Sequence, residues 1–463
     1  MKERPVIQWK CTTEAESWVD MPHIEYMDGV SDYHTANFRV SINPGRRYQV
    51  IDGWGGCFNE KSWDAMSVLS PSDRDRIIRM FFDAEKGCKL NICRTPIGAS
   101  DYALDNYTYN DTPRDFLMSD FSIDRDRCAL IPYIKAAKAC RPDLKLWAVP
   151  WVHPKWLEDP DGRLTQDPAI LSSYALYFSK YVQAYQAEGL NLFCVMPCNE
   201  PCWDDFWGAH HLKAPGNAAL MHNLVKNYLI PQFKKDQLDC ELWLGSFPID
   251  AEFNFVTTMM SDPDVAPTIK GAGYQWWADR AMRETHEHYP QLKLMQTETA
   301  CNLIDMTVKD LAIRQNTNDW AYAWQQWSLF RIWLEQWANS YMLWNLVLDE
   351  TGCNNSPDDP WPQCSPVVVN KKTREITVTP MFYAFKHFSF YIAPGAYRIH
   401  SEGDLENSIA FQNPNGDIIL EIANHQDCES LVTFYVDGKI TAPVLPARSW
   451  NTFVFPHGVS TPI

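Results

Sequence analysis

The sequence predicts an α/β fold in which a closed (β/α)8 TIM barrel carries an attached antiparallel β-sandwich, and two observations lead to this prediction. Eight short apolar runs between about residues 50 and 350 alternate with longer amphipathic stretches, as in a parallel barrel. From about residue 375 the pattern changes to alternating strands joined by tight turns. We expect the barrel to span 46–374, and strands from 1–45 to join the sandwich formed by 375–463.

The predicted barrel strands are apolar runs that end at polar or aromatic residues. They are residues 49–58, 89–94, 144–151, 192–200, 241–247, 270–277, 293–298 and 340–345. The stretches between them are predicted to be helices. One begins with Ser70-Pro71, a cap followed by proline, and another stops at Gly189. A doubly wound open sheet is the alternative, but the glycines of "GWGGCFNE" lack the spacing of a phosphate-binding turn.

Two turn signals define the predicted sandwich. Pro414-Asn415-Gly416 separates two runs of alternating apolar and polar residues, and Asp437-Gly438 separates another pair. The early segment "ANFRVSINP" is also strand-like. We therefore expect N-terminal strands to complete the same domain.

The charge balance disfavours several classes of partner. With 41 basic and 58 acidic side chains the formal net charge is −17, which argues against both nucleic acid and an anionic membrane surface. No apolar run is long enough to span a bilayer, and no apolar stretch follows the charges of "MKERPVIQWK" to form a signal peptide. Many of the 14 cysteines lie in apolar runs. We expect a cytoplasmic protein, although a secreted chain trimmed of its signal would look the same.

Cys194, Cys198 and Cys202 recur every four residues, which invites a metal-binding interpretation. Zinc sites usually combine short paired spacings with further Cys or His residues at a second place in the chain. This run instead crosses a predicted strand and its following loop. The sequence therefore predicts neither a metal site nor an organic cofactor.

In a barrel of this type the active site is built at the carboxyl ends of the strands. The predicted strands end in carboxylates, a guanidinium, amides and indoles. These residues are Arg94, Trp151, Asn199, Glu200, Trp276, Trp277, Glu298, Trp344 and Asn345. Paired carboxylates can cleave a glycosidic bond, indoles can stack on a sugar ring, and amides can bind its hydroxyls. The set predicts a site for sugar hydrolysis.

Glu200 follows the fourth predicted strand and Glu298 the seventh, so the two face each other across the barrel mouth. Retaining glycosidases hold their carboxyl groups about 5–5.5 Å apart, and inverting ones about 6.5–9.5 Å apart. An arbitrary glutamate is most often an ion-pair or surface residue. The position of this pair at strand ends, among tryptophans and an asparagine, favours catalysis instead.

At these positions the sequence resembles glycoside hydrolase family 30, the family of lysosomal glucosylceramidase and several microbial β-glycanases. The similar segments run through nearly the whole chain in the family's order. They are "IDGWGGCFNE", "CRTPIGASDYALDNYTYNDTP", "LKLWAVPWVHPKWL", "NEP", "QTETAC", "LWNLVLDETG" and "TPMFYAFKHFSFYIAPG". The resemblance implies a retaining β-glycosidase that works by double displacement through a glycosyl-enzyme.

The resemblance also implies roles for individual residues. Glu200 would be the general acid/base and Glu298 the nucleophile, with Arg94 beneath Glu298 favouring its ionised form. Asn199 would bind the sugar 2-hydroxyl. The remaining matches are Asp101, for hydroxyls on the far side of the ring, and the subsite-lining indoles Trp151 and Trp344.

The chain departs from the glucosylceramidase pattern at two places. Where that pattern reads His-Trp-Tyr, this chain has Gln275-Trp276-Trp277, so a tyrosine whose hydroxyl reaches the nucleophile is replaced. At the entry strand, "CFNEKSWDAM" replaces a stretch of small residues and puts residues 59–63 near the mouth. Both changes alter the edge of the pocket, so the resemblance does not carry over the identity of the substrate.

The leading hypothesis is a retaining β-glycosidase that acts on β-glucosides or closely related sugars, with imported oligosaccharides or glycosides as substrates of a cytoplasmic enzyme. The enzymatic alternative is an endo-β-1,6-glucanase or another β-glycanase of the same family. The alternative of another class is a catalytically inactive carbohydrate-binding protein. His210-His211 and the loop 354–366 are candidates for the aglycone side. The sequence does not indicate the sugar, the linkage, terminal or internal cleavage, or the oligomeric state.

Overall fold

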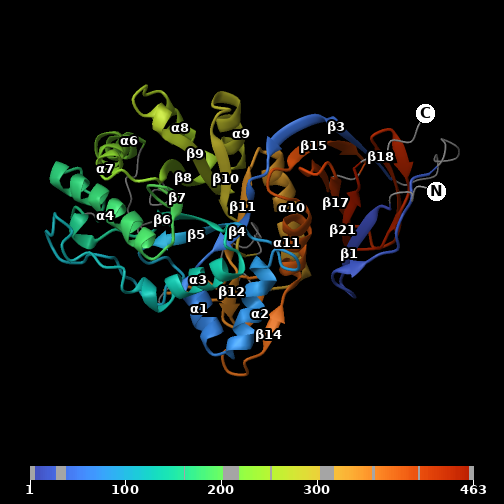
Figure 1. Cartoon of the computed structure of the whole chain (residues 1–463), viewed down its shortest axis with the longest axis horizontal. Coiled ribbons are helices and arrows are strands. Elements are labelled where there is room, and N and C mark those ends of the chain that lie inside the picture. The colour runs from blue at the N-terminus through green and yellow to red at the C-terminus, as the bar shows by residue number, and fades with distance from the viewer. Residues whose placement is uncertain are drawn as a thin grey trace.

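The protein consists of two lobes that lie side by side in Figure 1, a barrel surrounded by helices and a lobe of β-strands. The computed structural model describes residues 6–27, 38–160, 162–201, 218–250, 253–302, 318–356, 360–404 and 407–457. The first and last described strands both belong to the β-lobe. Within the described residues, no helix has the length and apolar character needed to cross a bilayer.

Eight parallel strands close the barrel in the order that the sequence predicts. They are β4 (Gly53–Cys57), β5 (Ile92–Ile97), β6 (Lys145–Pro150), β7 (Leu192–Val195), β8 (Glu241–Ile249), β9 (Ile269–Trp277), β10 (Lys293–Glu298) and β11 (Ser340–Asn345). The last strand closes the ring on the first, since Ser340 of β11 pairs with Gly53 of β4. The predicted TIM barrel is confirmed.

Two barrel strands, β5 and β7, end three or more residues away from the predicted position. β5 continues past Arg94, which therefore lies inside the strand rather than at its end. β7 stops before Asn199 and Glu200, so both residues follow the strand. The chain still runs beside its neighbours there, because Asn199 N donates to Pro150 O at 3.0 Å and Glu200 N donates to Ser246 O at 2.8 Å. These bonds keep both side chains at the carboxyl end of the barrel.

Helices cover the outside of the barrel (Figure 1). They are α1 (Glu60–Ser67), α2 (Pro71–Phe82), α3 (Leu130–Cys140), α4 (Pro168–Ala187), α6 (Ala218–Leu224), α7 (Ile230–Lys235), α8 (Phe253–Met260), α9 (Asp279–His288), α10 (Trp320–Glu335) and α11 (Pro380–Tyr391). α2 begins as predicted, with the Ser70 side chain accepting a hydrogen bond from Asp73 N and Pro71 in its first turn. α4 ends just before Gly189, whose φ of 76° is the left-handed conformation that stops helices.

The second lobe is a curled ten-stranded sheet in the order β19-β18-β3-β15-β16-β17-β21-β1-β2, with β20 paired to β18. Its strands are β1 (Gln8–Thr13), β2 (Val19–Asp20), β3 (Phe38–Val50), β15 (Tyr397–Gly403), β16 (Ser408–Gln412), β17 (Ile418–Asn424), β18 (Ser430–Val436), β19 (Lys439–Thr441), β20 (Val444–Leu445) and β21 (Ser449–Phe455). Its pairs are antiparallel except for β3 with β18. The N-terminal strands join this sheet as predicted, and both predicted turns, 414–416 and 437–438, connect adjacent strands.

A small three-stranded sheet beside α1 is absent from the sequence-based prediction. It consists of β12 (Val347–Asp349), β13 (Val367–Val369) and β14 (Ile376–Val378). The Ser62 hydroxyl on α1 donates to Val347 O at 2.7 Å and ties this sheet to the barrel. Strands of three residues are too short to show a periodic pattern, which explains why the sequence does not reveal them.

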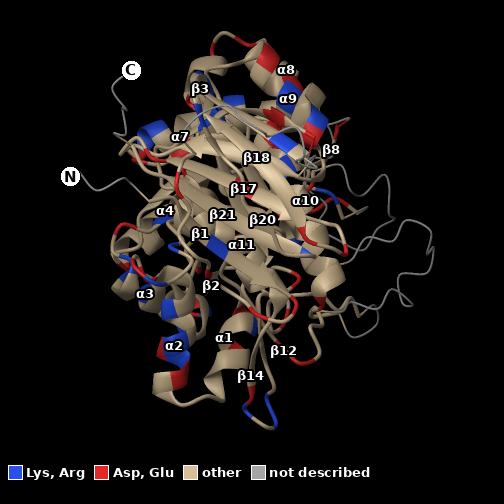
Figure 2. Ribbon diagram, turned by 90° about the vertical axis from the view of Figure 1, so that its right-hand side faces the viewer, with Lys and Arg blue, Asp and Glu red and all other residues tan. Residues whose placement is uncertain are grey.

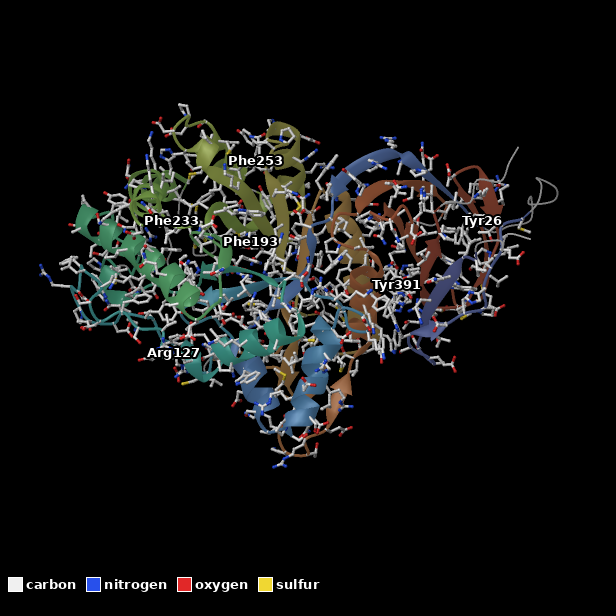
Figure 3. The ribbon with its side chains drawn as sticks, in the orientation of Figure 1. Tyr26, Arg127, Phe193, Phe233, Phe253 and Tyr391 are labelled. Carbon is white, nitrogen blue, oxygen red and sulfur yellow. The ribbon has the colours of Figure 1, made fainter. Side chains whose placement is uncertain are left out.

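Helix α11 joins the two lobes. Trp327 of α10 packs edge-on against Phe388 of α11, with ring centroids 4.9 Å apart, and stacks on Trp450 of β21 at 5.8 Å. Buried apolar residues of the barrel helices, of α11 and of the sheet form one continuous core. In Figure 3, Tyr391 at the end of α11 lies at the junction of the lobes, whereas Phe193 lies in the barrel. The β-lobe is therefore fixed to the barrel through a shared apolar interior.

Charged residues lie mainly on the outer helices and turns. Figure 2 shows Lys and Arg interleaved with Asp and Glu on α2 and α9, whereas the strands of the ten-stranded sheet are largely uncharged. On α2, for example, Arg79 Nε lies 2.7 Å from an Asp75 carboxylate oxygen. Such exposed pairs contribute little to stability, so the buried charges at the barrel mouth need a different explanation.

Candidate active site

The barrel brings one predicted carboxylate into contact with the predicted guanidinium. Glu298 is the last residue of β10 and is 5% exposed. Its Oε2 accepts a hydrogen bond from Nη1 of the fully buried Arg94 at 2.7 Å. The other terminal nitrogen, Nη2, donates to Oδ1 of Asn199 at 2.5 Å. One buried cation therefore holds both Glu298 and the asparagine that precedes Glu200.

The second carboxylate is held by an amide. Nε2 of Gln275 on β9 donates to Oε1 of Glu200 at 2.6 Å. Oε1 of Gln275 contacts the hydroxyls of Ser246 and Thr297. Because Thr297 directly precedes Glu298, the two carboxylates belong to one connected set of polar contacts. The structure therefore brings the predicted pair to the same end of the barrel.

Two residues of this site have left-handed backbone conformations. Both Glu200 and Trp276 have a φ of 53°. A residue other than glycine in this region costs on the order of 1–3 kcal/mol, and such residues concentrate at functional sites. The hydrogen bond from Glu200 N to Ser246 O helps to hold the conformation. The strained backbone turns the end of the loop so that the Glu200 side chain meets Gln275.

Burial raises the pKa of both carboxyl groups, but their neighbours act on them differently. Desolvation, then the negative charges of Glu298 and Asp101, raise the pKa of Glu200 well above its usual value. Desolvation also raises the pKa of Glu298, but the charge and the hydrogen bond of Arg94, and to a smaller extent a hydrogen bond of Gln275, offset part of this rise. Glu298 is therefore the member of the pair that ionises first, and Glu200 is the member that retains a proton.

Asp101 lies in the loop after β5 and adds a third carboxyl group to the mouth. Desolvation and the charge of Glu298 raise its pKa to about 8. Its Oδ1 is buried without a hydrogen-bond partner among the described residues. The neighbouring Tyr102 hydroxyl donates to Gly352 O at 2.8 Å and anchors this loop. A buried carboxyl oxygen that lacks a protein donor is suited to bind a hydroxyl group of a ligand.

The predicted tryptophans form two groups. Trp151 and Trp344 are 6% and 2% exposed, and their rings stack at 5.0 Å. Arg94 lies against this pair, with its guanidinium carbon 4.0 Å from the centre of the Trp151 ring. Trp276 and Trp277 are half-buried, with ring centroids 5.6 Å apart. The first pair forms the wall around Arg94, and the second pair directly follows Gln275 at the end of β9.

Two residues in the loop between β12 and β13 extend the site; the sequence indicates their loop, 354–366, as a candidate but not these two residues. The Trp361 ring stacks against Trp276 at a centroid distance of 5.8 Å. The Gln363 side chain accepts a hydrogen bond from Asn345 at 2.6 Å, and Asn345 accepts one from Asn59 at 2.8 Å. The only signal for these residues is their position in the proline-rich loop after the last barrel strand.

Asn59 lies at the mouth as expected, but the side chains of Glu60 and Trp63, which follow it in the chain, make their contacts away from the mouth. Both carboxylate oxygens of Glu60 bind Arg125, at 2.9 and 3.1 Å. The Trp63 ring stacks on Tyr133 of α3 at 5.6 Å, so it belongs to the helix packing rather than to the mouth. Asn59 precedes α1, and successive residues of a helix point in different directions around its axis, which is why the side chains of this segment separate.

Several other expectations concern residues outside the described part of the chain. His210, His211 and Cys202 lie in 202–217, and part of the 354–366 loop lies in 357–359, none of which the structure describes. Of the cysteine run, the structure describes Cys194 and Cys198, and both are buried.

A cavity of about 770 Å³ lies at the other end of the barrel. Its lining includes Lys145, Phe193, Glu241 and Lys270, which stand near the amino ends of β6 to β9. Residues at this face of a TIM barrel serve stability, whereas catalysis takes place at the carboxyl face. We therefore place the site at Glu200 and Glu298 and not in this cavity.

Cleavage of a glycosidic bond needs one carboxyl group that retains its proton and another that has lost it. The unequal surroundings of Glu200 and Glu298 provide this difference, at the face of the barrel where such enzymes act. Fold and site together define a glycoside hydrolase.

Comparison with known proteins leads to the same class of enzyme. Residues 51–392 match the glycosyl hydrolase family 30 TIM-barrel domain, so the chain belongs to this family. It is 26% identical over 439 residues to the lysosomal acid glucosylceramidase of Mus musculus, covering 90% of this chain and 83% of that protein. SrfJ from Salmonella typhimurium has a TM-score of 0.84 at 19% identity, over 98% of this chain and 100% of that one. The endo-β1,6-glucanase BT3312 has a TM-score of 0.79 at 22% identity, over 98% and 99%.

The family membership confirms the resemblance that the sequence motifs indicate. It confirms the enzyme class as well, and the main hypothesis of a retaining β-glycosidase agrees with it.

Proposed function

We propose that this enzyme hydrolyses β-glucosides or closely related β-linked sugars with Glu298 as the nucleophile and Glu200 as the general acid/base. One observation carries the assignment: a guanidinium, that of Arg94, donates to Glu298, whereas the donor to Glu200 is the neutral amide of Gln275. A neighbouring cation favours the ionised form of a carboxyl group, and a nucleophile must be ionised. An acid must instead retain its proton until the leaving group needs it.

In the first step the Glu298 carboxylate attacks the anomeric carbon, while Glu200 gives its proton to the glycosidic oxygen. The bond between the anomeric carbon and the glycosidic oxygen breaks, the aglycone leaves as an alcohol, and a glycosyl ester forms on Glu298. In the second step the ionised Glu200 takes a proton from water, whose oxygen attacks the anomeric carbon. Glu298 is released as a carboxylate, and the sugar retains its β configuration.

Asn199 and Asp101 are proposed to hold the sugar. Because Arg94 donates to Asn199 Oδ1, the amide nitrogen of Asn199 remains available to donate to the 2-hydroxyl. The buried Oδ1 of Asp101 is an acceptor for hydroxyls on the far side of the ring. The indoles of Trp276 and Trp277, at the end of β9, are proposed to contact the sugar or its aglycone.

Trapping of the glycosyl-enzyme tests this assignment. A 2-deoxy-2-fluoro-β-glucoside with a dinitrophenyl leaving group slows hydrolysis of the ester more than its formation, so the ester accumulates. Mass spectrometry of peptides should then find one glycosyl adduct, on Glu298. Glu298→Gln is the control and should carry no adduct. An adduct on a different carboxylate would overturn the assignment.

The second candidate is an endo-β-1,6-glucanase, motivated by the likeness in fold to a glucanase over nearly the whole chain. Incubation with β-1,6-glucan distinguishes the two candidates, because a glycosidase releases glucose from chain ends and a glucanase releases oligosaccharides of several lengths. A carbohydrate-binding protein without activity is the candidate of another class. Turnover of an aryl β-glucoside would exclude it.

We propose a reducing compartment, the cytoplasm, as the location of the enzyme. Most of the described cysteines are free thiols, among them the buried Cys57, Cys93 and Cys194. Free thiols are typical of proteins in reducing compartments. Fractionation of cells that express the untagged chain tests this proposal, and activity recovered only outside the cells would contradict it.

A further inference from the structure

The side chain of Gln275 is fully buried in the wall of the barrel, and both of its polar atoms have partners. Its Nε2 donates to Glu200 Oε1 at 2.6 Å. Its Oε1 contacts the hydroxyl of Ser246 and accepts from the hydroxyl of Thr297 at 3.1 Å. Ser246 lies on β8 and Thr297 on β10, the two strands that flank β9. The amide is therefore held from both neighbouring strands.

The partners of Gln275 favour one orientation of its amide group. Hydroxyl groups can donate to a carbonyl oxygen, and Oε1 faces two of them, on Ser246 and Thr297. The opposite orientation would turn that oxygen towards Glu200, which the double-displacement mechanism requires to be ionised in its second step. A carbonyl oxygen against a carboxylate is repulsive, whereas an N–H group is attractive. The orientation with Nε2 towards Glu200 therefore suits both steps.

We propose that Gln275 is a positioning residue for the acid/base: it occupies Oε1 of Glu200 with an N–H donor and thereby leaves the catalytic proton on Oε2. This inference rests on the proposed role of Glu200. In a protonated carboxyl group the carbonyl oxygen is the acceptor and the other oxygen carries the hydrogen. Because Nε2 of Gln275 selects Oε1 as the acceptor, the proton passes from Oε2 to the glycosidic oxygen, and the proton taken from water returns to Oε2.

The chemistry of an amide explains why it suits this position. An amide side chain does not titrate in the range where enzymes work, so its N–H group remains a donor whether Glu200 is protonated or ionised. The charged groups that act on Glu200 are Glu298, Asp101 and Arg94, and the Gln275 hydrogen bond lowers the pKa of Glu200 against the first two. Gln275 therefore orients the acid and also limits how strongly it holds its proton.

The proposal is tested by comparing how the Gln275→Leu variant hydrolyses two β-glucosides whose leaving groups differ in their need for a proton. We expect kcat/KM for an alkyl β-glucoside, whose leaving group needs a proton, to fall about tenfold to a hundredfold. For dinitrophenyl β-glucoside, which needs no proton, the fall should be less than about threefold. The basic limb of the pH profile should also move to higher pH, because loss of the donor raises the pKa of Glu200.

Two controls separate the possible outcomes. Gln49→Leu removes a buried glutamine of β3 that donates to Leu334 O at 2.5 Å, and both substrates should react normally in that variant. Glu200→Ala should discriminate strongly between the two substrates. If it does not, the proposed role of Glu200 is wrong.

If Glu200→Ala discriminates but Gln275→Leu slows both substrates equally without moving the basic limb, Gln275 is structural and the inference is overturned. Gln275→Met, which keeps an unbranched side chain, gives the same readouts should the leucine variant not fold.

Discussion

The barrel mouth and the junction between α11 and the ten-stranded sheet both bury a glutamate, but they do so in opposite ways. At the mouth, Oε2 of Glu298 accepts a hydrogen bond from the guanidinium of Arg94. At the junction, Glu421 of β17 is fully buried and accepts a hydrogen bond from the Thr452 hydroxyl at 2.6 Å. Its other oxygen has no hydrogen-bond partner among the described residues. One carboxyl group has a cation beside it, and the other has a neutral hydroxyl.

The junction continues as a chain of neutral groups. The Thr452 hydroxyl oxygen lies 2.7 Å from Nδ1 of His387, and Nε2 of His387 lies 2.9 Å from the Thr12 hydroxyl oxygen. Burial, and then the charges of nearby lysines, lower the pKa of His387 to about 3. Burial raises the pKa of Glu421 well above its usual value. Helix α11 is therefore joined to the sheet by uncharged hydrogen bonds at neutral pH.

The comparison shows that burial of an ionisable group does not by itself mark a catalytic site. A buried charge is stable only beside a matching charge, whereas a neutral carboxyl group needs only hydrogen bonds. The pairing of Glu298 with Arg94 preserves a charge in the barrel, which catalysis by a nucleophile requires. The surroundings of Glu421 suppress a charge, which suits a structural contact between lobes.

The largest expected effect is a loss of activity on substitution of Glu298, the buried glutamate at the barrel mouth. Glu298→Gln should lower turnover of an aryl β-glucoside roughly a thousandfold or more, because a neutral amide cannot form the glycosyl ester. The thermal midpoint should fall, because the glutamine still accepts a hydrogen bond from Arg94 but no longer matches its buried charge. Steady-state kinetics and calorimetry measure both quantities. Near-normal turnover in this variant would refute the assignment of Glu298.

The next effect concerns Glu200, the proposed acid. Glu200→Ala should slow alkyl β-glucosides about 10²- to 10⁴-fold and dinitrophenyl β-glucosides far less in their first step, because only the former need a proton. Azide should restore turnover of the activated substrate by attacking the glycosyl-enzyme, with a β-glucosyl azide as product. Product analysis by NMR checks this. Equal slowing of both substrates would exclude Glu200 as the acid.

A smaller effect is expected when the cation is removed. Arg94→Met leaves Glu298 buried without its partner, so the pKa of Glu298 should rise further. Because the nucleophile must be ionised, the acidic limb of the kcat/KM profile should move to higher pH. Stability at neutral pH should fall by about 3–5 kcal/mol, the cost of breaking a buried ion pair. An unshifted acidic limb in a folded variant would contradict the proposed function of the ion pair.

The smallest effect is expected at the junction. The pKa of Glu421 is raised in the folded state, so ionisation of this group stabilises the unfolded chain as pH rises above the usual value of 4.5. Glu421→Gln has no group to ionise at this position, so it avoids the loss of stability that the wild type undergoes as pH rises. It should be more stable than the wild type by about 1–2 kcal/mol at pH 8, but not at pH 4. Activity should be unchanged. Calorimetry at several pH values tests this, with the exposed Glu375→Gln as control, and a variant that loses stability at every pH would contradict it.

Much of the fold could be predicted because it depends on local patterns. Each barrel strand is an apolar run of a few residues followed by a turn. This pattern can be recognised without knowing which other strands lie beside it. The ends of strands are less visible, because burial continues past them. Arg94 illustrates this limit: β5 is buried throughout, so nothing in the sequence distinguishes its middle from its end.

The site was predictable to a similar degree. The two carboxylates stand next to recognisable motifs at strand ends, and the predicted Asn199 and Arg94 contact each other. Gln275 and Trp361 were not predictable as partners of Glu200 and Trp276. A glutamine in a strand and a tryptophan in a proline-rich loop are ordinary residues until the folded chain places them beside these groups.

The sequence by itself determined the alternation of strands and helices and the separate β-lobe, and it predicted two glutamates as candidates for catalysis, because these follow from residue types and their spacing along the chain. Only the tertiary structure decided which glutamate is paired with a cation and which is held by an amide. The reason is that the pKa of a buried carboxyl group depends on neighbours that come from other strands, and these neighbours meet only when the barrel closes.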